Sequence, residues 1–260
     1  MKKLMITAAA AVCATVGFAA LESANIVGYQ ETETPDSGNK MVAGTFMTVG
    51  ANGSFNLSDL RGTGYDPEDG AWGELKVTVL NSAGSAASDG EGNPLRFYWY
   101  DNEDVEAGWY DINGEEAWDA ANVSFDAGQA FWVQGDGQSL NAAGQVDLTT
   151  VAVATPDSGN VATGNPFPVA ITLAKMSGAG YDPEDGAWGE LKATILNVAG
   201  SAASDGEGNP LRFYWYDNED VEAGWYDADG EEAWDPTTEI AAGEGLWVQG
   251  DGQTIVFAAE

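Results

Sequence analysis

The stretch GNPLRFYWYDNEDVEAGWYD occurs twice in this chain without change, at residues 92–111 and again at residues 208–227. In its segment LRFYWYD (residues 95–101), alternate side chains fall on opposite faces if the segment is a β-strand. The expected core face carries Leu95, Phe97 and Trp99. The expected outer face carries Arg96, Tyr98 and Tyr100. The shorter segment GWYDI (residues 108–112) is typical of a further strand, so each copy predicts two β-strands.

The duplication extends beyond this stretch. Residues 64–111 and their copies at 180–227 differ at three positions, which are Val77/Ala193, Val79/Ile195 and Ser82/Val198. The shorter copies TPDSGN and WVQGDGQ continue the similarity on both sides. We therefore expect two units, residues 20–141 and 142–260, each of ordinary single-domain size. The period of 116 residues is too long for the common solenoid repeats, which favours two tandem homologous domains.

The other segments of each unit also indicate β-structure. LKVTVLN (residues 75–81) and AFWVQG (residues 130–135) are short, rich in β-branched or aromatic residues and bounded by turn-forming residues. Two-residue hairpin turns are predicted at Asn113-Gly114, Asp229-Gly230, Asp136-Gly137 and Asp251-Gly252. No comparably long stretch shows helical periodicity. The sequence predicts an all-β chain of two tandem homologous antiparallel β domains, with a β-sandwich preferred and a small open barrel as the second choice.

Residues 1–19 have the pattern of a bacterial secretory signal peptide. Lys2 and Lys3 precede an uncharged apolar run, and small residues occupy the cleavage positions that end at Ala19. The apolar run is too short for a stop-transfer helix, and no later segment offers about 18 consecutive apolar residues. We therefore expect a secreted, extracellular or cell-surface protein without membrane insertion.

The chain is strongly acidic, with a formal net charge of −33. Without the two lysines of the signal peptide, 7 basic and 42 acidic side chains remain, for a net charge of −35. Such an excess repels nucleic acid and anionic membranes, which bind through basic surfaces. Solubility and tolerance of salt are the first explanation of the charge, and collection of divalent cations is the second. Ten Trp, nine Tyr and nine Phe exclude a disordered acidic tail.

The residue types that are missing exclude many chemistries. The chain has no His, and its one cysteine, Cys13, lies in the expected signal peptide. Catalytic triads, ordinary zinc sites and the usual haem or iron–sulfur ligation all need one of these side chains. A glycosidase needs only two opposed carboxylates, but no spacing among the 42 acids distinguishes a pair. We therefore expect no enzymatic activity.

Several short motifs resemble those of a known group of proteins. They are SANIVGY at residues 23–29, GNPFPVAITL at 164–173, the FYWYD and GWYD segments, and GEGLWV at 243–248. In this order they resemble secreted surface proteins of Verrucomicrobia and their relatives, and NPFP…FYWYD…GxGLWV modules are similar to surface modules of Bacteroidetes. The resemblance covers nearly all of the second unit. It implies an extracellular, β-rich protein in a group whose members mostly have no assigned activity.

Tryptophans next to acidic side chains are the candidate ligand-binding residues. Of the five in each unit, Trp99 and Trp132 lie in apolar segments and are expected in the core. In GWYDI, alternation places Trp109 on the same face as Asp111, which predicts that Trp109 is exposed. An exposed indole stacks on a sugar ring while neighbouring acids accept hydrogen bonds from hydroxyls. The candidates are Trp109, Trp118, Trp225 and Trp234.

Acidic loops are the candidate calcium sites. Ca²⁺ takes six to eight oxygen ligands, which closely spaced carboxylates in glycine-containing turns can supply. The candidate ligands are Asp66, Asp69, Asp101, Asp104, Asp182, Asp185, Asp217 and Asp220. These loops do not have the EF-hand spacing, and Asp also favours turns for conformational reasons. Solvated turns are therefore the first explanation and calcium binding the second.

Two functions remain open at this point. One is a secreted, non-enzymatic surface or extracellular-matrix protein built from a duplicated β module, with other surface proteins as partners. The other is a bivalent carbohydrate-binding protein, in which two linked weak sites gain avidity on an extracellular polysaccharide. The exposure of the candidate tryptophans distinguishes them.

Overall fold

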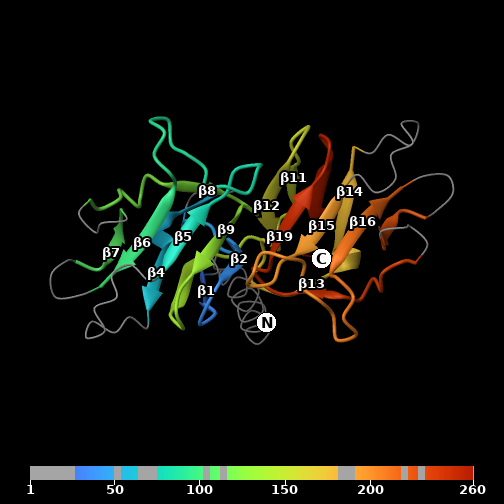
Figure 1. Ribbon diagram of the computed structural model, residues 1–260, viewed down its shortest axis with the longest axis horizontal. Coiled ribbons are helices and arrows are strands. Elements are labelled where there is room, and N and C mark those ends of the chain that lie inside the picture. The colour runs from blue at the N-terminus through green and yellow to red at the C-terminus, as the bar shows by residue number, and fades with distance from the viewer. Residues whose placement is uncertain are drawn as a thin grey trace, which may run out of the picture.

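The computed structural model describes residues 27–49, 54–63, 75–101, 106–111, 116–180, 191–217, 222–227 and 232–259. In these ranges the chain is all-β, with several antiparallel sheets of the β-sandwich type (Figure 1). This confirms the predicted fold class. The expected signal peptide and the turns Asn113-Gly114 and Asp229-Gly230 lie outside the described residues. No helix within the described ranges has the length and apolar character needed to cross a membrane.

The first unit contains a five-stranded sheet in the order β2-β9-β5-β6-β7, a three-stranded sheet β1-β10-β4 and the pair β3-β8. Its strands are β1 (Val27–Glu33), β2 (Asn39–Ala43), β3 (Ser54–Asn56), β4 (Leu60–Thr63), β5 (Lys76–Val79), β6 (Arg96–Tyr100), β7 (Gly108–Tyr110), β8 (Ser124–Asp126), β9 (Ala130–Gln134) and β10 (Ser139–Gln145). A 3-10 turn, η1 (Leu57–Asp59), precedes β4. Strand β10 crosses the expected boundary between residues 141 and 142.

The second unit repeats this arrangement with the sheets β12-β19-β15-β16-β17 and β11-β20-β14 and the pair β13-β18. Its strands are β11 (Val151–Ala154), β12 (Asn160–Gly164), β13 (Ile171–Thr172), β14 (Met176–Ala179), β15 (Lys192–Ile195), β16 (Arg212–Tyr216), β17 (Gly224–Tyr226), β18 (Glu239–Ile240), β19 (Gly245–Gln249) and β20 (Thr254–Phe257). The 3-10 turn η3 (Leu173–Lys175) matches η1.

Each unit has its own hydrophobic core between its sheets. The buried residues of the first core lie between residues 42 and 140, and those of the second core lie between residues 167 and 257. Phe97 and Trp99 are 0% and 8% exposed, so the predicted core face of β6 is confirmed. Tyr100, expected on the outer face, is only 1% exposed and meets Tyr110 edge-on, with ring centroids 5.6 Å apart. The outer face of this sheet is therefore partly covered.

The turn at Asp136-Gly137 is not the predicted hairpin. Strand β9 belongs to the five-stranded sheet and β10 to the three-stranded sheet, so the turn carries the chain from one layer to the other. Only its glycine has a positive φ, of 75°, whereas a type I′ turn needs positive φ at both central residues. The Gln138 side chain accepts a hydrogen bond from the Asp136 N–H. The same correction applies to Asp251-Gly252.

The two units pack against each other through small residues. Met41, Ala43, Ala130 and Ala162 form a separate buried cluster, with Trp132 and Trp247 packed against it. A Cβ atom on Gly245 would lie 2.6 Å from the main-chain carbonyl carbon of Met41, so glycine is required for this close approach. Trp132 is half-buried at this junction, which corrects its expected place in the core of its own unit.

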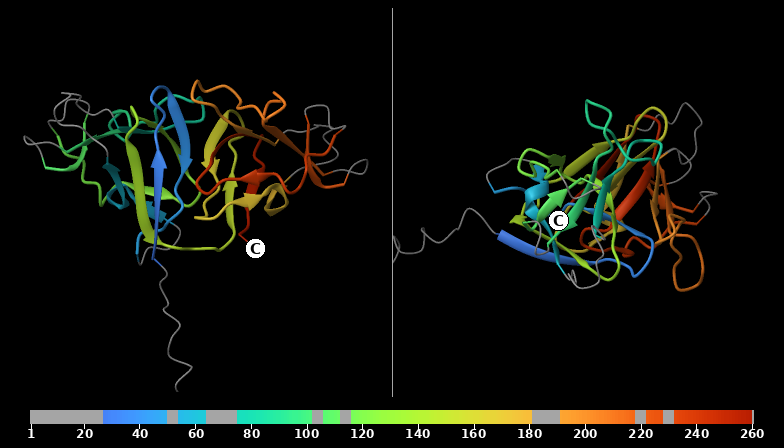
Figure 2. Two further views of the ribbon diagram at one scale, coloured as in Figure 1. Left: turned by 90° about the horizontal axis from the view of Figure 1, so that it is seen from below. Right: turned by 60° about the vertical axis from the view of Figure 1, so that its left-hand side comes forward.

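The contacts between the units are reciprocal. The N–H of Asn39 donates to the carbonyl of Val198 at 3.0 Å, and the N–H of Asn160 donates to the carbonyl of Ser82 at 2.9 Å. Asn39 and Asn160 occupy matching positions of the repeat, as do Ser82 and Val198. The same exchange occurs in two isolated β-bridges, Val42 with Glu244 and Thr163 with Gln129. Such reciprocity is the property of an interface with two-fold symmetry. The left view of Figure 2 shows the two units side by side.

One acidic side chain at this interface is partly buried. Burial raises the pKa of the Glu244 carboxyl above its ordinary value of 4.5, and the positive charge of Lys40 opposes this shift. Because the pKa of Glu244 is higher in the folded state than in the unfolded chain, protonation of Glu244 stabilises the folded state. Its contribution is fully present below the pKa of the unfolded chain and is lost as pH rises through the folded pKa.

We therefore expect Glu244→Gln to flatten the pH dependence of the melting temperature between about pH 4 and the raised pKa. The difference between variant and wild type isolates this group from the other carboxylates. The exposed Glu239→Gln is the matched control. Equal differences for the two variants across this range would contradict the role of Glu244.

Candidate ligand clefts

Two matching clefts lie at the edges of the five-stranded sheets that end in β7 and β17. The cleft of the first unit has a volume of about 440 Å³ and that of the second about 450 Å³. The lining of the first cleft includes Asp89, Arg96, Tyr98, Asp111, Glu116 and Trp118. Their copies in the second cleft are Asp205, Arg212, Tyr214, Asp227, Glu232 and Trp234. The clefts consist of the same residue types because all twelve positions lie in conserved copies of the repeat.

The end of strand β7 shapes the cleft. β7 pairs with β6 up to Tyr110, which lies opposite Tyr98. The chain then returns alongside β7, where the N–H of Asp111 donates to the carbonyl of Glu116 at 2.9 Å and Ala117 bridges to Tyr110. This return brings Trp118 to the cleft wall.

The indole of Trp118 is held by the core on one side. Its ring meets Phe97 edge-on, with centroids 4.9 Å apart and an interplanar angle of 79°. In the second unit the indole N–H of Trp234 also donates to the main-chain carbonyl of Arg212 at 3.1 Å. Both tryptophans are half-buried and line their clefts. Each cleft therefore has a fixed aromatic wall.

The loop that carries Asp89 forms another part of the wall. Its carboxylate accepts hydrogen bonds from the N–H of Glu91 at 2.9 Å, the N–H of Asn93 at 2.8 Å and the Asn93 amide at 3.0 Å. The hydrogen bonds from Asn93 hold the pKa of Asp89 below its ordinary value. Asp205 makes the same bonds in the second unit. These carboxylates stay ionised and fix the loops.

Cationic side chains lie on the same face of the sheet. Arg96 lines the cleft, and the Lys76 ammonium lies 6.0 Å from the centroid of the Tyr98 ring. Burial, followed by the positive charge of Arg96, lowers the pKa of Lys76. Among the described lining residues of each cleft, four carboxylates accompany one guanidinium. The cleft is therefore polar, net negative and aromatic on one side.

Two of the four candidate tryptophans do not reach these clefts. Trp109 is 3% exposed and Trp225 is 5% exposed, so the prediction that they face solvent is wrong. Their indole N–H groups donate to the main-chain carbonyls of Leu60 at 2.9 Å and of Met176 at 2.7 Å. Trp109 lies opposite Trp99, and paired residues share a face of the sheet. Asp111 lies after the end of β7, so its position does not show which face of the strand is exposed to solvent.

Most candidate calcium ligands lie outside the described residues, namely Asp66, Asp69, Asp104, Asp182, Asp185 and Asp220. Asp101 and Asp217 are described and are exposed just after β6 and β16. In the part of the chain that is described, no three His, Cys, Asp or Glu side chains gather closely enough to hold a metal ion. Calcium binding stays a prediction.

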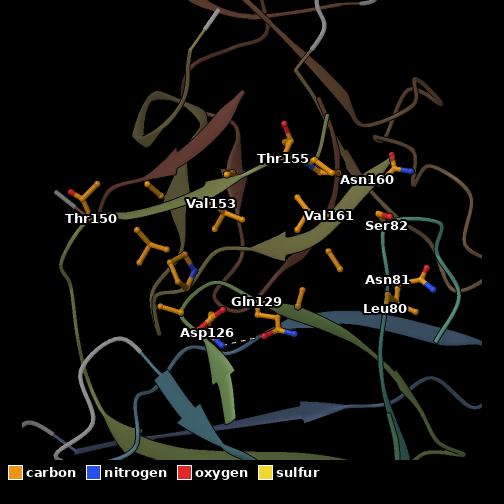
Figure 3. Close-up of a pocket in the computed structure, with 18 of the residues that line it drawn as sticks. Leu80, Asn81, Ser82, Asp126, Gln129, Thr150, Val153, Thr155, Asn160 and Val161 are labelled. Atoms are coloured by element: carbon orange, nitrogen blue, oxygen red, sulfur yellow. Dashed lines mark hydrogen bonds between the residues drawn. The ribbon is translucent and has the colours of Figure 1, made fainter. Parts of the chain in front are cut away.

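A larger cavity, of about 840 Å³, lies between the units (Figure 3). Val153 and Val161 line it from the second unit and Gln129 from the first. Its counterpart across the approximate two-fold axis measures about 400 Å³. There the Gln30 amide donates to the carbonyl of Ala242 at 3.1 Å, whereas Val151 occupies the matching position beside the larger cavity. Sequence reasoning missed this cavity because it depends on how the units pack.

Comparison of the chain with protein-family models, with curated proteins and with solved structures finds no match.

Proposed function

We propose that this chain is a secreted, non-enzymatic surface protein that binds neutral polysaccharide through its two clefts. The half-buried Trp118 and Trp234, each fixed edge-on against a core phenylalanine, carry the proposal. A rigid indole offers apolar area to the ring face of a sugar, and the surrounding polar groups offer partners to its hydroxyls. The amino-terminal sequence supports secretion.

The charge of the clefts favours a neutral polymer over an anionic one. With four carboxylates and one guanidinium per cleft, a polymer of uronic acids or sulfated sugars meets like charge. Hydroxyl groups donate to carboxylates and accept from the guanidinium, so a neutral sugar satisfies both. The acidic surface keeps such a protein soluble between the polymers that it binds.

The proposal predicts that Trp118→Ala with Trp234→Ala weakens binding at least tenfold, about 1.4 kcal/mol per cleft. The probes are neutral hexasaccharides of glucose, xylose and mannose, measured by titration calorimetry. The control is Tyr29→Ala, which removes an exposed aromatic side chain from β1, away from both clefts. An oligosaccharide that binds the double variant as tightly as the wild type would refute the role of these tryptophans.

A further inference from the structure

We infer that the two clefts hold two separate polymer chains, so that one molecule cross-links its ligand instead of gripping a single chain twice. The inference rests on the proposed function and adds to it the arrangement of the ligand. It follows from the symmetry that relates the units, from the position of the clefts in each sheet and from the direction of a polysaccharide chain.

The symmetry is shown by the reciprocal contacts. Asn39 contacts Val198 in the same way as Asn160 contacts Ser82. Asn39 occupies the same position of the repeat as Asn160, and Val198 the same position as Ser82. An interface in which equivalent residues exchange partners is isologous, which requires an approximate two-fold axis between the units. A head-to-tail arrangement would pair each surface with a different one. The two clefts are therefore two-fold mates.

The clefts lie far from this axis. In each five-stranded sheet, one edge strand, β2 or β12, packs at the interface, while the cleft forms beside the two strands at the other edge. Four strand spacings separate β2 from β7, about 19 Å at the usual distance between neighbouring strands. The same spacing applies in the second unit. Figure 1 shows β7 at one end of the longest axis and β16 near the other.

A two-fold axis reverses every direction along the line that joins two mates, because that line is perpendicular to the axis. A polysaccharide has two different ends, so its direction matters to a cleft made of fixed side chains. A straight chain that enters the first cleft in the favoured direction would cross the second cleft backwards. The two clefts consist of the same residues, so they do not favour opposite directions.

The packing of the units opposes reorientation of one cleft. Only residues 146–150 connect β10 to β11. The N–H of Ala43 donates to the carbonyl of Gly243 at 3.0 Å, and the Thr163 hydroxyl donates to the carbonyl of Gly128 at 2.6 Å. These bonds cross the interface beside the closely packed Gly245. The second cleft therefore adds no avidity for a single straight polysaccharide chain, because avidity requires that both clefts bind the same chain at once.

The experiment uses the full mature chain and two probes. Calorimetry with the neutral hexasaccharides is expected to give two sites per molecule. Light scattering with a long soluble polymer of the hexasaccharide that binds is expected to rise and then fall as protein is added, because excess protein saturates separate chains. Trp118→Ala or Trp234→Ala, each with one intact cleft, is expected to give no such rise. An equimolar mixture of the two variants, at twice the wild-type protein concentration so that the number of intact clefts is the same, is also expected to give none.

The outcomes separate the two ideas. Absence of hexasaccharide binding overturns the proposed function and this inference with it. If the hexasaccharide binds at two sites, two further results together overturn this inference alone. The wild type would show no scattering maximum, and its affinity for a single polymer chain would exceed that of the single-cleft variants more than tenfold. Arg96→Ala and Arg212→Ala each change an exposed side chain of one cleft. These variants repeat the scattering test without altering the core.

Discussion

Replacement of Trp109 and Trp225 by alanine is expected to destabilise both units strongly. Each indole is at least 95% buried, meets a second tryptophan edge-on at 5.2 Å and donates a hydrogen bond to a main-chain carbonyl. Truncation of a buried large aromatic costs about 3–5 kcal/mol through lost transfer free energy and the cavity left behind. Because domains are marginally stable, each substitution removes much of the stability of its unit. Urea unfolding followed by circular dichroism measures the loss.

The matched control for this prediction is Trp118→Ala with Trp234→Ala, from the same part of each unit. These side chains are only half-buried, so the double variant is expected to lose clearly less stability than the first. A loss below about 1 kcal/mol for Trp109→Ala would contradict its assignment to the core. The two double variants thus separate the structural tryptophans from the cleft tryptophans.

The second large effect is expected at the interface. In Gly245→Val, the new side chain would overlap the main chain of Met41, because a Cβ atom already falls 2.6 Å from its carbonyl carbon and 2.7 Å from its carbonyl oxygen. The main chain on both sides would have to shift. Overpacking of this kind costs about 1–3 kcal/mol, and we also expect the units to separate. Thermal unfolding, with small-angle scattering for the separation, measures both effects.

The control for the interface is Gly206→Ala. A Cβ atom there meets nothing within 4 Å, and the residue is exposed. This variant is expected to stay within about 0.5 kcal/mol of the wild type. If Gly245→Val unfolded at the wild-type temperature and kept the wild-type radius of gyration, the close approach of the units would be refuted.

Strands β5, β6, β7 and β9 of the first unit were predictable because their signal is local. Strands β5, β6 and β9 lie within the apolar segments that the sequence indicates, and alternation correctly assigns Phe97 and Trp99 to the core. The error at Trp109 has a physical cause. A three-residue strand is too short for alternation to define its faces, and its pairing with β6 decides them instead.

The clefts and the interface were predictable only in part. Trp118 and Trp234 were identified by their acidic neighbours, and they do line clefts. Asp89 lines the same cleft as Trp118 but is 29 positions away in sequence, and the return of the chain along β7 brings the two together. The interface depends on small residues, Ala43 and Gly245 among them, which give no periodic signal.

The near identity of the two copies also affects how this chain folds. Strands β5 to β7 and β15 to β17 carry almost the same residues, with differences at Val77/Ala193 and Val79/Ile195, so during folding either set is able to pair with β9 or β19. Exchange of such segments is a typical misfolding route of repeat proteins. The segments around the copies differ more, as in NKMVA of β2 against NVATG of β12. During synthesis the first unit leaves the ribosome before the second. If the first unit folds before the second is made, its strands are already paired and the exchange is prevented.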